Sequence, residues 1–152
     1  MTELAMTKKK VEVHGPLTPR QVAEAWFSNL EQNKFQDAQA LLDGNVVWEN
    51  IRSTPGVSDL APWLGSYQGL AAALKSVDVW SAHSRLLEFK LLRLLVDGSE
   101  AVGFVHERAQ CLANNNEYDV YPAYSLSIEA GKIKHYQSIW DISPLIKAYR
   151  NI

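Results

Sequence analysis

The fold is decided by residues 85–112, RLLEFKLLRLLVDGSEAVGFVHERAQCL, which contain two extended segments joined by a tight turn. The turn is Asp97-Gly98, a dipeptide that strongly predicts a two-residue hairpin between strands. Two further extended segments follow it along the chain. Four long segments joined by short turns predict an antiparallel meander, over Arg85–Val96, Glu100–Leu112, Glu117–Ile128 and Lys132–Trp140.

Helical patterns come before these segments. Thr18 is an expected N-cap, Pro19 fits the first helical position, and Gln21 can close a capping box back to Thr18. The remaining expected elements are a short second helix ending at Gly44, a strand over Asn45–Ile51, a third helix over Gly69–Trp80 and a closing helix from Ser143-Pro144. Helices first and sheet second, without regular alternation, predict the α+β class.

The composition excludes several classes of protein. The chain has 152 residues, a formal net charge of -2 and a hydrophobic fraction of 47%, which argue against a nucleic-acid binder, a membrane span and a disordered chain. Residues 1–15 lack periodicity and are expected to be a flexible tail before a single domain over 16–152. Cys111 is the only cysteine, so no disulfide can form within the chain and a cytoplasmic location is expected.

Alternation along the strands assigns side chains to faces of the sheet. On the second long segment, Glu107 shares a face with Val105 and Ala109, so this lone carboxylate either faces solvent or is functional. On the third segment, the face that carries Ala123 is small and polar, which is typical of a pocket wall or a wet interface. Pro122 cannot donate to a ladder and predicts an edge or a bulge there.

The order of these elements resembles the nuclear transport factor 2-like superfamily, which includes ketosteroid isomerases, SnoaL-like polyketide cyclases and limonene epoxide hydrolases. The resemblance rests on the segments Val22–Phe27, Asn33–Phe35, Val46–Glu49, Tyr67–Gly69, Asp97-Gly98, Gly131–Ile133 and Trp140-Asp141. It implies a cone-shaped roll, in which a strongly curved antiparallel sheet is wrapped by N-terminal helices around an apolar cavity. It also implies a homodimer, formed through the sheet.

The resemblance assigns site positions one at a time. The isomerase base matches Asn50, and the two oxyanion donors match Trp26 and Ala123, so steroid-type enolisation by that set of residues is not expected. In the epoxide hydrolase pattern, the arginine matches Val105 and the two aspartates match Glu107 and Ser138, so one carboxylate remains. The substrate-binding residues expected around the cavity are Trp26, Trp48, Asn50, Trp63, Ala123, Ser138 and Trp140.

Glu107 is the expected catalytic residue. A carboxylate in an aromatic cavity has its pKa raised by desolvation, toward the range in which a base works near neutral pH. The predicted activity is cofactor-independent isomerisation, cyclisation or hydration of a hydrophobic or aromatic small molecule, with no metal. The alternatives are a structural ion pair of Glu107 with Arg85, Arg108 or a residue of a neighbouring subunit, a non-catalytic ligand-binding module, and a dimerisation domain whose own tryptophans fill the cavity.

Overall fold

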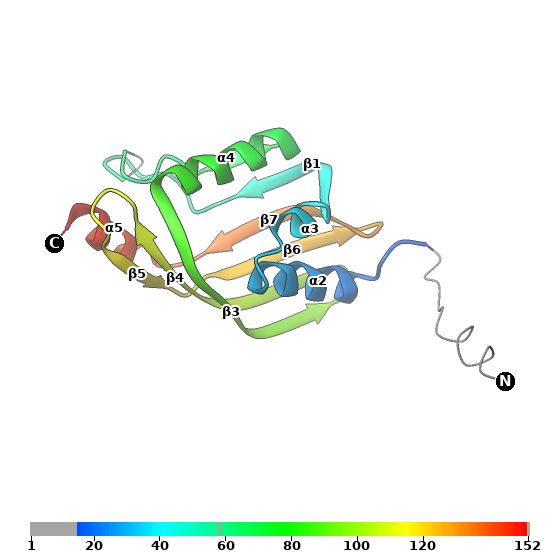
Figure 1. Cartoon of the computed structure of the whole chain (residues 1–152). Coiled ribbons are helices and arrows are strands. Elements are labelled where there is room, and N and C mark those ends of the chain that lie inside the picture. The colour runs from blue at the N-terminus through cyan, green and yellow to red at the C-terminus, as the bar shows by residue number, and fades with distance from the viewer. Residues whose placement is uncertain (1–14, 58, 152) are drawn as a thin grey trace.

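A computed structural model describes residues 15–57 and 59–151 of the chain (Figure 1). Over this part of the chain, four helices accompany a seven-stranded sheet. The helices are α2 (Pro19–Glu31), α3 (Phe35–Gln39), α4 (Leu70–His83) and α5 (Ser143–Arg150). The strands are β1 (Leu42–Glu49), β2 (Ser66–Gln68), β3 (Ser84–Asp97), β4 (Glu100–Cys111), β5 (Glu117–Val120), β6 (Ala123–Glu129) and β7 (Lys132–Ile139).

The sheet has the strand order β2-β1-β7-β6-β4-β3. The short strand β5 pairs with the C-terminal part of β4, and β6 pairs with the N-terminal part. The long hairpin β3–β4 and the hairpin β6–β7 are antiparallel, as the turns predict. The antiparallel sheet that the resemblance implies needs one correction, because β1 pairs with β7 in parallel. This pairing joins segments about 90 residues apart, so no local turn signal announces it.

The third predicted extended segment is divided in two. Pro122 lies between β5 and β6, and both strands pair with β4. The predicted irregularity at Pro122 is therefore confirmed. Register shifts in β3 between Leu86 and Glu88 and between Leu91 and Arg93 add further bulges, which increase the curvature of the sheet.

The first helix begins as predicted. The Thr18 side chain accepts a hydrogen bond from the Gln21 N–H at 3.1 Å, and the Gln21 side chain accepts one from the Thr18 N–H at 2.9 Å. The second helix differs from its prediction, because it ends at Gln39 and Gly44 lies inside β1. Pairing of Leu42 with Ile133 of β7 extends that strand toward its N-terminus, and this long-range contact outweighs the local helical pattern.

The helices lie over one face of the curved sheet and enclose the core (Figure 1). Helix α2 approaches β4 so closely that a Cβ on Gly103 would lie 2.2 Å from the Phe27 ring, so only glycine fits there. The structure confirms the α+β class and the cone-shaped roll. The predicted flexible tail falls largely on residues 1–14, which lie outside the described residues. Among the described residues, no helix is both long and apolar enough to cross a bilayer.

Candidate functional site

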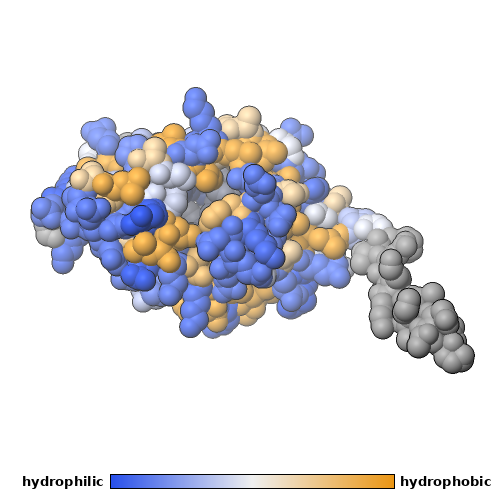
Figure 2. Space-filling view, viewed as in Figure 1, coloured by the Kyte–Doolittle hydropathy of each residue, from blue (hydrophilic) through white to orange (hydrophobic). Residues whose placement is uncertain are grey.

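A cavity of about 670 Å³ lies between α2 and α3 on one side and α4 on the other, with the sheet as its wall. Figure 2 shows the surface hollowed at this place. The volume is within the range of about 300–1,000 Å³ that is usual for small-molecule sites. The lining includes all five tryptophans of the chain, namely Trp26, Trp48, Trp63, Trp80 and Trp140. A cavity of this size contradicts the alternative in which tryptophan side chains fill the interior.

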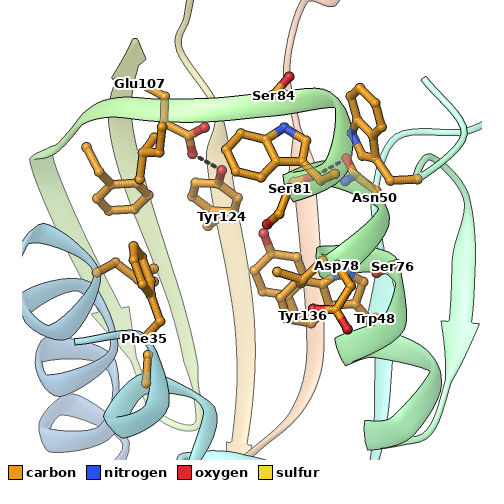
Figure 3. Close-up of a pocket in the computed structure, with 18 of the residues that line it drawn as sticks. Phe35, Trp48, Asn50, Ser76, Asp78, Ser81, Ser84, Glu107, Tyr124 and Tyr136 are labelled. Atoms are coloured by element: carbon orange, nitrogen blue, oxygen red, sulfur yellow. Dashed lines mark hydrogen bonds between the residues drawn. The ribbon is translucent and has the colours of Figure 1, made fainter. Parts of the chain in front are cut away.

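Glu107 projects from β4 into this cavity (Figure 3). Its carboxylate accepts a hydrogen bond from the Tyr124 hydroxyl, and among the described residues it forms no ion pair. A structural pair with Arg85 or Arg108 is therefore wrong, because Arg85 donates to Gln110 and Arg108 pairs with Glu117 at 2.8 Å, while a pair with a neighbouring subunit stays a prediction. Those partners lie along the opposite, outward face of the sheet.

Burial dominates the electrostatics of Glu107. Desolvation raises the pKa of Glu107 from its ordinary value of 4.5 to about 7, against the smaller opposing effects of the Tyr124 hydrogen bond and of His106. His106 follows the alternation to the outward face, where its ring lies 2.7 Å from an Asp119 oxygen. The carboxyl therefore exchanges a proton in the neutral range, as a general acid or base must.

Two tyrosines that the sequence analysis missed complete this end of the site. Tyr124 of β6 lies beside Tyr136 of β7, with their ring centroids 5.5 Å apart, and the two hydroxyls interact. Burial and the negative charge of Glu107 keep the pKa of both phenols well above its usual range, so both remain protonated donors. Tyr136 in turn stacks on Trp48 at 3.6 Å, with only 9° between the ring planes.

The sequence does carry a signal for the first of these tyrosines. Alternation along the third extended segment puts Tyr118 and Tyr124 on one face with Leu126. A buried tyrosine hydroxyl still needs a partner, however, and several on one face indicate a polar cavity wall. For the face that carries Ala123, the pocket-wall alternative is wrong, because Ala123 lies on the outward face, opposite Ile139, and does not line the cavity. The wet-interface alternative for that face stays a prediction.

A second polar cluster joins three residues that were predicted separately. The Asn50 Oδ1 atom accepts hydrogen bonds from the Ser138 hydroxyl at 2.8 Å and from the Trp140 indole at 3.3 Å. All three residues line the cavity, and Figure 3 shows Asn50 across the cavity from Glu107. Asn50 stands just after β1, and Ser138 lies on β7, so the parallel pairing of these strands brings them together.

The remaining predicted residues differ in their surroundings. Trp26 of α2 lines the cavity, and its indole nitrogen is buried without a hydrogen-bond partner among the described residues, packed edge-on against Trp48 and Tyr136. Trp63 lines the cavity from the loop after Pro62 and packs against Tyr149 of α5. In the part of the chain that the structure describes, no group of three His, Cys, Asp or Glu side chains could hold a metal ion.

No family model matches this chain, and no curated protein matches it. Solved structures do match it. A nuclear transport factor 2-like protein from Burkholderia thailandensis shares 17% identity at a TM-score of 0.74, over 87% of this chain and 97% of that one. This chain has the nuclear transport factor 2-like fold.

Two further structures with this fold show the range of its members. An LEH-like epoxide hydrolase from M. tuberculosis matches with 14% identity and a TM-score of 0.64, over 88% of this chain and 90% of that one. TerC, co-crystallised with polyporic acid, matches with 15% identity and a TM-score of 0.68, over 87% and 98% of the two chains. At such identities the fold is shared, while the chemistry must be argued from this chain's own residues.

Proposed function

We propose that this domain binds a planar hydrophobic or aromatic molecule in its cavity and transfers a proton on it, with Glu107 as the base. The observation that carries the proposal is a carboxylate inside an aromatic cavity that forms no ion pair with the described residues and is held by the Tyr124 hydroxyl. A buried carboxylate without a counter-ion is costly, and such an arrangement is typical of functional sites.

The chemistry follows from the protonation states. Glu107, when ionised, takes a proton from an acidic carbon of the ligand and becomes a neutral carboxylic acid. The electron pair of the broken C–H bond is delocalised into the conjugated system of the ligand. Glu107 then returns the proton to another atom, which gives an isomerisation and needs no redox cofactor. General-base catalysis by a positioned carboxylate contributes about 10²- to 10⁴-fold.

Hydrogen–deuterium exchange tests the proposal without knowledge of the true substrate. In D₂O, the wild-type protein should accelerate exchange at the acidic carbon of aryl methyl ketones, as observed by NMR. Glu107→Gln should abolish the acceleration, whereas Glu129→Gln, the same change at an exposed position at the end of β6, should retain it. Equal exchange rates with wild-type protein and with Glu107→Gln would reject Glu107 as the base.

The second candidate is a non-catalytic ligand-binding module of the same fold. It is favoured by the chemistry opposite Glu107, where Asn50 and Ser138 stand at positions that the resemblance assigns to acidic residues. Ligand binding in the cavity without any accelerated exchange would support this candidate.

We also propose that two copies associate through the outward face of the sheet, in the cytoplasm. The Leu95 and Ile139 side chains are about half exposed on this face, and Arg93 lies 4.5 Å from the centre of the Phe104 ring. Exposed apolar side chains of this size on one face are typical of an interface. Sedimentation should give a dimer mass for the wild type and a monomer for Leu95→Lys. A monomeric wild type at micromolar concentration would reject the dimer.

A further inference from the structure

The Asn50 side chain is fixed in one orientation. Its Oδ1 atom accepts hydrogen bonds from the Ile51 N–H at 2.9 Å, the Ser138 hydroxyl at 2.8 Å and the Trp140 indole at 3.3 Å. A backbone N–H and an indole N–H can only donate, so the atom that they share must be the amide oxygen. The amide nitrogen is thereby turned away from all three donors.

This nitrogen carries two donors that the protein does not use. The Asn50 Nδ2 atom makes no hydrogen bond with the described residues, yet it is not among the fully buried atoms that lack a partner. It therefore remains accessible, and Asn50 lines the cavity. A ligand that expels water from these donors without replacing its hydrogen bonds loses affinity. The bound ligand therefore needs an acceptor atom at this position.

The charge of the lining indicates which acceptor fits. Glu107 lies inside the cavity and Asp78 of α4 lies on its exposed rim, whereas the cation of the lining, Arg85, is exposed and donates to Gln110. Two carboxylates disfavour an anionic group, so a carboxylate or phosphate is a poor fit. A neutral carbonyl oxygen accepts from an amide without that repulsion.

The sheet register gives the distance from Asn50 to Tyr124, the residue that holds Glu107. Asn50 lies beside Ser138 of β7, and Ser138 is paired with Tyr124 of β6. Neighbouring strands are about 4.8 Å apart, so the backbones of Asn50 and Tyr124 are separated by about 10 Å. Tyr124 holds Glu107, and the Tyr136 ring lies on the wall between the two ends. A conjugated skeleton of two rings spans this wall.

We propose that Asn50 determines specificity, by donating a hydrogen bond to the neutral carbonyl oxygen of a conjugated two-ring ligand whose acidic carbon lies at Glu107. The position of the acidic carbon rests on the function proposed above, while the carbonyl subsite rests on the Asn50 geometry alone. Asn50 is thus a positioning residue at the end of the cavity opposite the base.

A matched pair of probes tests the carbonyl subsite. 2-Acetylnaphthalene and 2-isopropylnaphthalene have nearly the same shape, and only the ketone carries an acceptor. Their dissociation constants can be measured by quenching of the tryptophan fluorescence of the full chain. One hydrogen bond predicts that the wild type prefers the ketone by roughly 2- to 10-fold.

Asn50→Asp is the most informative variant, because it exchanges the hydrogen-bond donors of the subsite for an acceptor. The carboxylate can accept the same three hydrogen bonds, which keep it ionised and its surroundings folded, but it presents an acceptor in place of the two donors. We expect the preference for the ketone to vanish or reverse. Asn50→Ala, which removes the donors without adding a charge, should also abolish the preference. Gln68→Glu, the same type of change at an exposed position of β2, should leave the preference intact.

Each outcome has a defined meaning. A ketone preference that is absent in the wild type, or unchanged in both Asn50 variants, overturns the proposal, as does failure of the ketone to bind. A preference that depends on Asn50 upholds the carbonyl subsite whether or not Glu107→Gln changes the exchange rates measured above, and equal exchange rates there would overturn only the catalytic role of Glu107.

Discussion

Replacing Glu107 by Gln should make the protein more stable at alkaline pH. In the folded chain, burial raises the pKa of Glu107 from 4.5 to about 7. Between these values the folded state retains a proton that the unfolded state has released. The free energy of unfolding therefore falls as the pH rises from about 4.5 through 7, and the loss is complete above about pH 8. Each pKa unit corresponds to about 1.4 kcal/mol, so the whole displacement costs about 3 kcal/mol.

Glutamine has the same shape and is neutral at every pH, so it removes this penalty. The free energy of unfolding can be measured by urea denaturation at pH 4.5 and at pH 8. The difference between Glu107→Gln and the wild type should increase by up to about 3 kcal/mol from the lower to the higher pH, in favour of the variant. In thermal denaturation at pH 8, the same difference corresponds to an increase in the melting temperature on the order of 10 °C. Glu129→Gln provides the control, because its side chain is exposed. If Glu107→Gln and the wild type show the same pH dependence, then Glu107 is not desolvated and the reasoning fails.

Three further predictions concern single contacts. Tyr124→Phe removes the hydrogen bond that lowers the pKa of Glu107, so this pKa should rise further, by about one unit or more. An NMR titration of the Glu107 carboxyl carbon measures it. An unchanged pKa would show that the Tyr124 hydroxyl does not donate to Glu107. Gly103→Ala should lower the free energy of unfolding by about 1–3 kcal/mol in urea, because its Cβ would overlap the Phe27 ring, and an unaffected midpoint would contradict this close approach. Thr18→Ala should cost about 1 kcal/mol through loss of the α2 cap, measured in the same way, with no change in the titration of Glu107.

The local elements could largely be predicted because their signals are short-range. The capping box at Thr18, the Asp97-Gly98 hairpin and the break at Pro122 each depend on a few adjacent residues, and each is found in the structure. The errors occur where distant segments meet. The parallel pairing of β1 with β7 extends β1 through Gly44, which local periodicity assigns to the end of a helix.

The candidate site divides in the same way. Alternation predicted that Glu107 shares a face with Val105 and Ala109, and a lone carboxylate on such a face was a sound candidate. Alternation cannot say which of the two faces is covered by helices, so Ala123 was expected in the cavity, whereas Tyr124, on the other face, lines it. Tyr124 and Tyr136 gain their significance only from the cross-strand contacts that bring their hydroxyls together near Glu107.

The sequence by itself determined the α+β class, the order of helices and strands, the abundance of tryptophan and the lone carboxylate of β4, because these depend on composition and on neighbours along the chain. The tertiary structure decided that Glu107 faces an open cavity without an ion-pair partner among the described residues, and that Asn50, Ser138 and Trp140 form one hydrogen-bonded cluster across that cavity. Desolvation and hydrogen bonding depend on what surrounds a side chain in space, and in this fold most of those surroundings come from residues far away in the sequence.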